Sequence, residues 1–258
     1  MLIFIGLGLH GEGISLLGLR EAQKADIVYA ELYTSLVVGL DLKGLEQEIG
    51  KPVQVVYRET VEQRPDDILN AAKVGKVAFL VPGDPMVATT HVDLRLRAAR
   101  AGIQTKIVHG ASIGSAAAGL AGLQSYKFGR SATVSFPDNP SQVPYETLVE
   151  NRERGLHTLL LLDIRAKEGR AMLSSEAIEI MLGLEKKLPK NAFTPDTLAV
   201  VVARAGSDDA IVKADKVGRL QKLDFGPPPH VLIVPGKLHF VEAEALKVFA
   251  DASEDMVQ

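Results

Sequence analysis

The sequence contains no cysteine and no tryptophan among its 258 residues. A chain without cysteine can form no disulfide, no thiolate nucleophile and no thiolate metal site, and its composition fits a reducing compartment such as the cytoplasm. The six histidines are scattered along the chain, and none forms an H-x-x-x-H pair. Because that spacing is typical of helical metal sites, we expect no bound metal ion.

The sequence also lacks an excess of charge and any long apolar run. Its 29 Lys and Arg residues are balanced by 32 Asp and Glu residues, for a net charge of −3. Without a basic face we expect no direct binding of nucleic acid. Charged residues interrupt every apolar stretch before the roughly 18 residues that a membrane crossing needs. The opening "MLIFIG" has no basic segment and favours a buried strand over a signal peptide.

Short runs rich in Val, Ile and Leu alternate with segments of helical period, which is typical of parallel strands joined by crossover helices. We expect strands at residues 2–6, 26–31, 53–58, 77–82 and 105–110, and in a second series at 132–136, 158–164, 197–205, 210–214 and 230–235. Helices are expected near residues 15–24, 66–74, 91–101, 112–123, 145–154, 174–188 and 240–251. The pattern predicts an α/β fold.

Glycines, alanines and serines cluster between residues 110 and 130, around a predicted helix that could serve as a hinge. The cluster indicates two α/β domains. The first is an N-terminal α/β domain of residues 1–110. The second is a C-terminal α/β domain of residues 111–258, which includes the linking helix.

The first predicted strand leads into Gly6, Gly8 and Gly11, which spell G-x-G-x-x-G, and Glu31 ends the next strand. This spacing is the fingerprint of dinucleotide-binding folds, in which the helix starts at the glycines and its N–H groups meet a pyrophosphate. Here the better helix cap is Ser15, four residues late. We therefore interpret the glycines as a turn that packs or serves another ligand, and keep an NAD-dependent oxidoreductase as the alternative.

Two further turns follow predicted strands. In "VAFLVPGDPM" the strand ends at Pro82-Gly83-Asp84-Pro85, which holds Asp84 between two prolines. In "VHGASIGSAAAG" the turn offers Ser112 and free backbone groups at a helix start. Ligands of open α/β sheets bind at the carboxyl ends of the strands, so these turns indicate a small-molecule site at that edge.

The chain resembles the tetrapyrrole-methylase superfamily through "FIGLGLHGEGISLLGLREAQKADIVYAE", "VPGDPMVATTH" and "HGASIGSAAA". Within it the resemblance is greatest to the archaeal diphthine synthase branch, through "YAELYTS", "YKFGRSATVSFP", "GLHTLLLLDI", "VVARAGS" and "PPHVLIVPGKLHFVEAEAL". The resemblance implies S-adenosylmethionine bound between the two α/β domains and S-adenosylhomocysteine as product. It further implies trimethylation of the 3-carboxy-3-aminopropyl histidine of translation elongation factor two, giving diphthine, and a homodimer.

Position by position, the resemblance implies eight cofactor contacts: Leu9, Asp84, Val87, Ser112, Ile113, Leu162, Ala205 and His230. The apolar members would form walls for the adenine and the methionine chain, while the polar members and backbone groups would fix orientation. Methyl transfer to an amine needs a neutral nucleophile. Asp84, Glu31 and His91 are candidate proton acceptors, none of which the sequence assigns, and Tyr33 or Tyr126 could face the cationic product.

Other functions remain open beside this one. A tetrapyrrole methyltransferase of the same superfamily is one alternative, and only the diphthine-specific segments argue against it. An RNA methyltransferase is disfavoured because the chain has no basic face. A non-catalytic interaction protein could dock through the amphipathic segment at residues 236–250.

Overall fold

The computed structural model describes residues 1–257, which form two compact units. The first unit comprises Met1–Ile113 together with Ala166–Glu168, and the second comprises Gly114–Arg165 and the chain from Gly169 onward. The division falls within helix α5 (Ile113–Ala121). This helix lies in the segment of small residues from which the sequence predicts a boundary at residues 110/111.

The first unit contains a fully parallel sheet of five strands. These are β1 (Leu2–Gly6), β2 (Ile27–Glu31), β3 (Val53–Val56), β4 (Val77–Val81) and β5 (Thr105–Val108), in the order β3-β2-β4-β1-β5. Every residue of β1 and β4 is buried. Because both faces of these central strands are covered, their sequences are continuously apolar and do not alternate.

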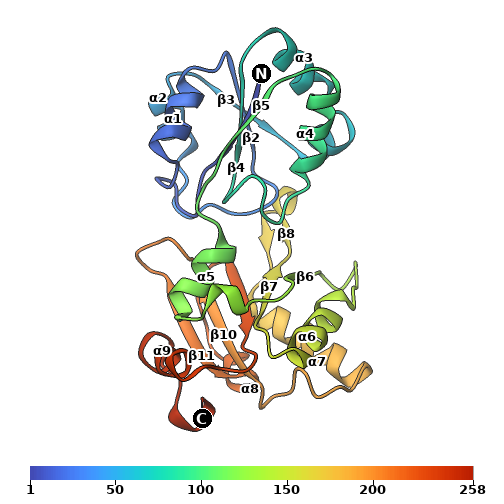
Figure 1. Ribbon diagram of the computed structural model, residues 1–258, viewed down its shortest axis with the longest axis vertical. Coiled ribbons are helices and arrows are strands. Elements are labelled where there is room, and N and C mark those ends of the chain that lie inside the picture. The colour runs from blue at the N-terminus through green and yellow to red at the C-terminus, as the bar shows by residue number, and fades with distance from the viewer. Residues whose placement is uncertain (258) are drawn as a thin grey trace. The chain divides into compact units, whose positions relative to one another are not determined.

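Helices cover both faces of this sheet (Figure 1). Helices α1 (Leu16–Gln23) and α2 (Leu42–Ile49) lie on one face, and α3 (Asp66–Val74) and α4 (His91–Arg100) lie on the other. A short π-helix, η1 (Glu59–Gln63), precedes α3. The predicted helices at residues 15–24, 66–74 and 91–101 are confirmed, whereas α2 and η1 were not predicted. Ser15 caps α1 by accepting a hydrogen bond from the Gly18 N–H at 3.0 Å.

The second unit also has a five-stranded sheet, but it is mixed. Its strands are β6 (Ala132–Val134), β7 (Thr158–Leu162), β10 (Leu198–Ala203), β11 (Ile211–Lys216) and β12 (His230–Val234), in the order β11-β10-β12-β7-β6. Only β6 and β7 are parallel, and the other three pairs are antiparallel. The prediction of parallel strands was therefore wrong here, since a strand buried on both faces is apolar whichever way its neighbours run.

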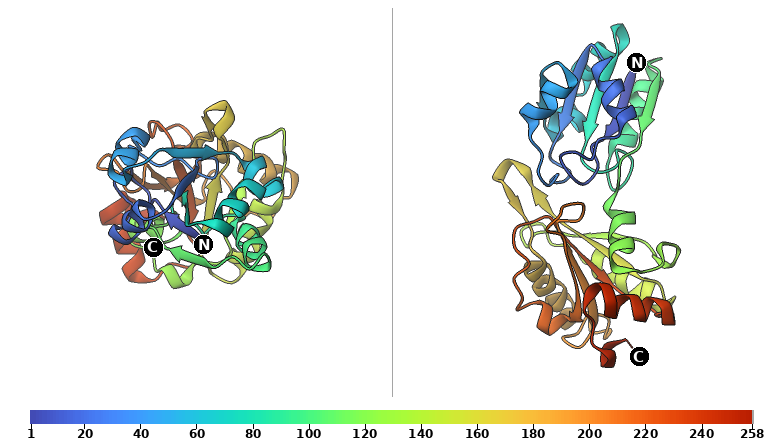
Figure 2. Two further views of the ribbon diagram at one scale, coloured as in Figure 1. Left: turned by 90° about the horizontal axis from the view of Figure 1, so that it is seen from above. Right: turned by 90° about the vertical axis from the view of Figure 1, so that its left-hand side faces the viewer.

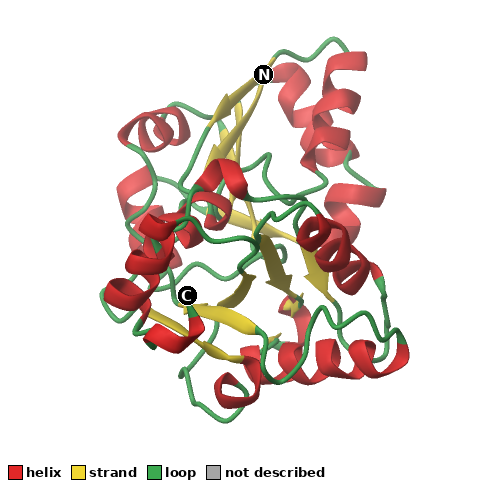
Figure 3. Ribbon diagram, turned by 60° about the horizontal axis from the view of Figure 1, so that its bottom comes forward, coloured by secondary structure: helices red, strands yellow, loops and turns green. Residues whose placement is uncertain are grey.

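Helices flank the second sheet as well, with the strands as the inner layer (Figure 3). Helices α6 (Val143–Glu153) and α7 (Ser174–Lys187) lie on one side, and α5 and α9 (Phe240–Ala250) lie on the other (Figure 1). In the right-hand view of Figure 2, the red helix α9 lies in front of its sheet. A one-turn helix, α8 (Val217–Leu220), and a hairpin of β8 (Ile164–Arg165) and β9 (Arg170–Ala171) complete the unit, and neither was predicted.

Candidate functional site

The loops that follow β1, β4 and β5 meet at the carboxyl edge of the first sheet. Strands β1 and β4 are neighbours, yet β1 leads to α1 on one face of the sheet and β4 leads to α4 on the other. Such a reversal is the topological switch point at which open α/β sheets bind ligands. The sheet edge at which the sequence predicts a small-molecule site therefore coincides with this switch point.

Gly6 and Gly110 allow the loops to approach each other. A Cβ on Gly6 would lie 2.5 Å from the Gly83 carbonyl oxygen and 2.6 Å from the Gly110 nitrogen. A Cβ on Gly110 would lie 2.4 Å from that same oxygen. Gly8 and Gly83 also exchange two backbone hydrogen bonds, of 3.1 and 2.8 Å. Gly6 and Gly110 therefore pack against the backbone of the neighbouring loops, with no room for a side chain.

The G-x-G-x-x-G turn uses its backbone N–H groups for hydrogen bonds within the unit. The Gly8 N–H donates to Gly83, the Gly11 N–H to the Val38 carbonyl at 2.7 Å, and helix α1 begins only at Leu16. The backbone donors are therefore used within the unit and do not point at a pyrophosphate.

Glu31, the second part of the dinucleotide fingerprint, is also committed internally. It is fully buried, and its carboxylate accepts from the Tyr33 N–H and the Thr34 N–H, each at 3.1 Å, and from the Thr34 hydroxyl. A buried carboxylate with three internal donors cannot bind a ribose hydroxyl without breaking these bonds. The alternative of an NAD-dependent oxidoreductase is therefore not favoured.

Asp84 links the second loop to the third. Its Oδ1 accepts from the Met86 N–H at 2.9 Å, and its Oδ2 accepts from the Gly110 N–H at 3.3 Å and from His109 Nδ1 at 2.7 Å. The residue is only 6% exposed, so the carboxylate acts first as a clamp between the loops. The sequence placed Asp84 correctly at the sheet edge, but it did not reveal His109 as the partner.

The other predicted contacts of the first unit lie on these same loops. Leu9 and Ile113 are partly exposed, Val87 is 45% exposed, and Ser112 is partly exposed beside Ile113 at the start of α5. Accessible apolar side chains next to a hydroxyl match a ligand that combines an aromatic base with polar groups. The side chains present therefore fit S-adenosylmethionine.

In the second unit, strand register brings the predicted residues to one edge of the sheet. Ala203 of β10 pairs with His230 of β12, and Ala205 follows two residues later. Val231 pairs with Leu161, so that Leu162 and His230 are the next positions along β7 and β12. Leu162, Ala205 and His230 come from separate parts of the chain, but the sheet places their strand ends side by side.

His230 is buried, and both ring nitrogens are used within the unit. Nδ1 accepts from the Ser174 N–H at 3.2 Å, so Nε2 carries the proton and donates to the Pro227 carbonyl at 3.1 Å. Burial lowers the pKa of this histidine and favours the neutral ring. Any contact of His230 with a ligand would therefore run through its backbone.

Two of the candidate proton acceptors are inaccessible. Glu31 and His91 are both 0% exposed, and Glu31 Oε1 lies 3.6 Å from His91 Nε2. Burial raises the pKa of Glu31 and lowers the pKa of His91, so both side chains are pushed toward their neutral forms. His91 Nδ1 donates to the Pro85 carbonyl at 3.1 Å. His91 thus ties the start of α4 to the loop after β4, and neither Glu31 nor His91 reaches the surface.

The two candidate aromatic faces differ in access. Tyr33 is 6% exposed, and the Arg58 guanidinium already lies 5.4 Å from its ring centroid. Tyr126 is 78% exposed. Of the two rings, only that of Tyr126 is accessible.

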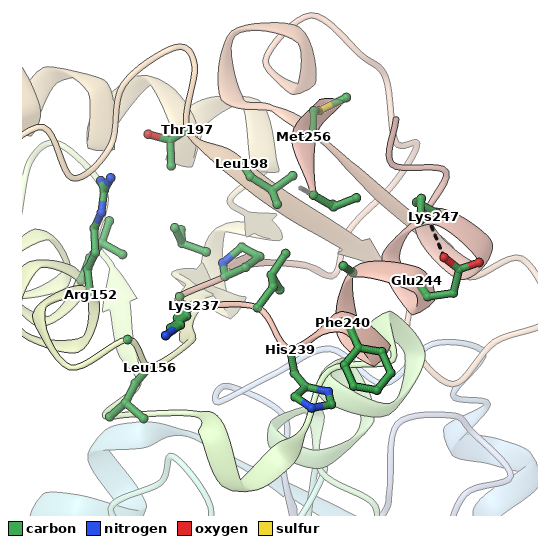
Figure 4. A pocket seen from close by; sticks show the side chains of 18 of the residues that line it. Arg152, Leu156, Thr197, Leu198, Lys237, His239, Phe240, Glu244, Lys247 and Met256 are labelled. Carbon is green, nitrogen blue, oxygen red and sulfur yellow. Dashed lines mark ion pairs between the residues drawn. The ribbon is translucent and has the colours of Figure 1, made fainter. Parts of the chain in front are cut away.

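A cavity of 1170 Å³ lies in the second unit (Figure 4). It is lined by the last turns of α6, the start of β10, the segment from Val234 to Phe240, and α9. These elements lie at the start of β10 and the end of β12, away from the edge that carries Ala205 and His230. The cavity therefore does not coincide with the predicted cofactor contacts.

Within residues 1–257, no group of three or more His, Cys, Asp or Glu side chains is arranged to hold a metal ion. None of the helices in this same range is long and apolar enough to cross a membrane.

Comparison with known proteins gives consistent matches along the chain. Residues 1–221 match the model of the tetrapyrrole (corrin/porphyrin) methylases. The diphthine synthase of Methanocella arvoryzae is 50% identical over 97% of this chain and 98% of its own length. That of Methanosarcina acetivorans is 50% identical over 95% of this chain and 94% of its own length. A crystal structure of a diphthine synthase superposes with a TM-score of 0.91, at 42% identity over 99% of this chain and 98% of that one.

Proposed function

We propose that the protein, which belongs to the tetrapyrrole methylase family, is an S-adenosylmethionine-dependent methyltransferase that makes diphthine. The observation that carries the proposal is the near-complete coverage by diphthine synthases at about half identity, with the fold retained. A tetrapyrrole methyltransferase would share the fold and the cofactor, but the similarity favours the diphthine branch.

The substrate is the 3-carboxy-3-aminopropyl histidine of translation elongation factor two, whose amino group receives up to three methyl groups. Because that substrate is a translation factor, the reaction takes place in the cytoplasm. S-adenosylmethionine supplies an electrophilic methyl group on a sulfonium, so the protein chiefly has to align the donor with the amine and take up a proton.

The cofactor contacts that we propose on the first unit are Leu9, Asp84, Val87, Ser112 and Ile113. Leu9, Val87 and Ile113 supply apolar surface, and the turn at Ser112 supplies a hydroxyl and backbone groups. Asp84 holds the loops that carry them through its bonds to His109 and Gly110. On the second unit we propose Leu162, Ala205 and His230, with His230 contributing through its backbone because its ring is committed.

Calorimetric titration tests the cofactor. S-adenosylhomocysteine is expected to bind with one site per chain, whereas NAD and NADP give no heat of binding, because the glycine turn donates its N–H groups internally. Micromolar binding of NAD, with none of S-adenosylhomocysteine, would contradict the proposal.

We further propose a homodimer. Exposed apolar side chains on α9 support it, since Phe240 is 77%, Val248 62% and Phe249 60% exposed. Light scattering at micromolar concentration is expected to give twice the 27.7 kDa mass of one chain. A mass of one chain under those conditions would exclude a stable dimer.

A further inference from the structure

We propose that His109 is the general base that removes a proton from the substrate amine, with Asp84 as its positioning residue. This inference rests on the proposed function. His109 directly follows β5, at the same sheet edge as the loops of the proposed cofactor contacts. Its side chain is 71% exposed, whereas that of Asp84 is 6% exposed.

The geometry of the pair fixes the tautomer that the neutral imidazole adopts. An ionised carboxylate can only accept hydrogen bonds, so the 2.7 Å contact requires that His109 Nδ1 carry the proton. The lone pair of the neutral ring then lies on Nε2, on the other side of the ring from Asp84. A buried carboxylate that orients an accessible imidazole in this way is the arrangement by which histidine bases are prepared in other enzymes.

The fold explains how two distant residues form this pair. Strands β4 and β5 are not neighbours, because β1 lies between them. Gly6, the last residue of β1, has no side chain to separate the two loops, and the Gly110 N–H also donates to Asp84. Asp84 is itself held by the Met86 N–H. These hydrogen bonds hold the imidazole of His109 in one orientation, so the position of its acceptor nitrogen Nε2 is defined.

Other titratable groups near this edge have partners of their own. In the loop after β1, the Glu12 N–H donates to His10 Nδ1 at 3.2 Å, so that His10 has no carboxylate behind its ring. The buried candidates Glu31 and His91 have no exposed surface. His109 is the histidine at this edge that combines an accessible ring with an orienting carboxylate.

Trimethylation takes three cycles, each with one proton transfer and one methyl transfer. In each, His109 Nε2 accepts one proton from the substrate ammonium, and the amine lone pair that is freed forms a C–N bond as the C–S bond breaks. The sulfur keeps the electron pair of the broken bond and becomes a neutral thioether. The new ammonium again carries a proton until the third methyl group is added. The exposed imidazolium returns its proton to water between rounds.

The test compares His109→Gln, His109→Ala and Asp84→Asn with the parent chain, using S-adenosylmethionine and elongation factor two that bears the aminocarboxypropyl histidine. His109→Gln is expected to bind S-adenosylhomocysteine like the parent and to lose roughly 10² to 10⁴-fold in kcat near neutral pH. The acid side of the pH–rate profile should differ between the two proteins, because only the parent has a base that protonation can block. The His109→Gln rate should keep rising with pH as free amine accumulates.

Two readouts separate a base from a structural role. Added imidazole is expected to restore part of the rate to His109→Ala, because an exogenous base can enter the vacated space. Asp84→Asn should lower kcat more than it raises KM for the protein substrate. The control is His239→Asn, which removes an exposed ring that caps α9 and keeps a capping side chain, so kcat should be unchanged.

A parental rate and pH profile in His109→Gln would overturn the proposal, and so would a loss of S-adenosylhomocysteine binding in His109→Gln with no imidazole rescue of His109→Ala. Failure of the proposed function looks different, since the parent chain itself would then leave the modified histidine unmethylated.

Discussion

Incubation of the protein with S-adenosylmethionine and elongation factor two that bears the aminocarboxypropyl histidine is expected to add three methyl groups at that residue. Unmodified factor should gain none. The physical reason is that ordinary histidine offers no aliphatic amine, so the acceptor exists only after the earlier modification. Mass spectrometry of the target peptide gives the number of methyl groups directly.

The number three follows from the chemistry of the amine. After two transfers the nitrogen is tertiary and still has a lone pair once it is deprotonated. The third transfer produces a quaternary ammonium with a permanent charge, which no base can remove and which ends the series. A matched reaction with the tetrapyrrole uroporphyrinogen serves as control. Methylation of that compound or of unmodified factor, without methylation of the modified histidine, would refute the diphthine activity and leave the family and fold unchanged.

The sequence predicted those features of the fold that depend on local chemistry. Ser15 was assigned as a cap because its hydroxyl can satisfy a backbone donor of the first turn, and it bonds to Gly18 in the structure. Helix α2 carried comparable signals and was overlooked. Asp41 caps it by accepting from Lys43, and Gly50 ends it in the left-handed region at φ 79°.

What the sequence could not supply are relations between distant segments. Apolar runs do not encode strand direction, so the sequence predicts parallel pairs where the second sheet has antiparallel ones. The two prolines beside Asp84 mark it in the sequence. Its bond to His109, however, forms only because the loops after β4 and β5 meet beyond the end of β1, which lies between these strands. A signal for His109 existed, since it lies at the end of a predicted strand and next to a glycine, and Asp84 also lies next to a glycine.

Replacement of Gly110 by alanine is expected to disrupt the loop junction. The new Cβ would lie 2.4 Å from the Gly83 carbonyl oxygen and 3.0 Å from atoms of Gly6. These neighbours are backbone atoms in a hydrogen-bonded turn and cannot turn aside as a flexible side chain would. Forcing a methyl group into such a space costs roughly 1 to 3 kcal/mol in the free energy of unfolding.

The effect on ligand binding should be the clearer one. If the loops after β4 and β5 separate, the bonds of Asp84 to His109 and Gly110 lengthen, and the proposed contacts at Val87 and Ser112 move with them. We expect S-adenosylhomocysteine to bind at least tenfold more weakly, which corresponds to about 1.4 kcal/mol. Calorimetric titration measures the affinity, and thermal unfolding of the same sample shows that the chain is folded.

Gly119→Ala is the matched control, because it adds the same methyl group in helix α5 where no atom lies within 4 Å of the new Cβ. Alanine is a better helix former than glycine, so this variant should be more stable by about 0.5 to 1 kcal/mol and should bind S-adenosylhomocysteine like the parent. Equal affinities for Gly110→Ala and Gly119→Ala would mean that the close approach of the three loops is not required to bind the cofactor. A loss confined to Gly110→Ala, in a folded protein, would place the cofactor at this junction.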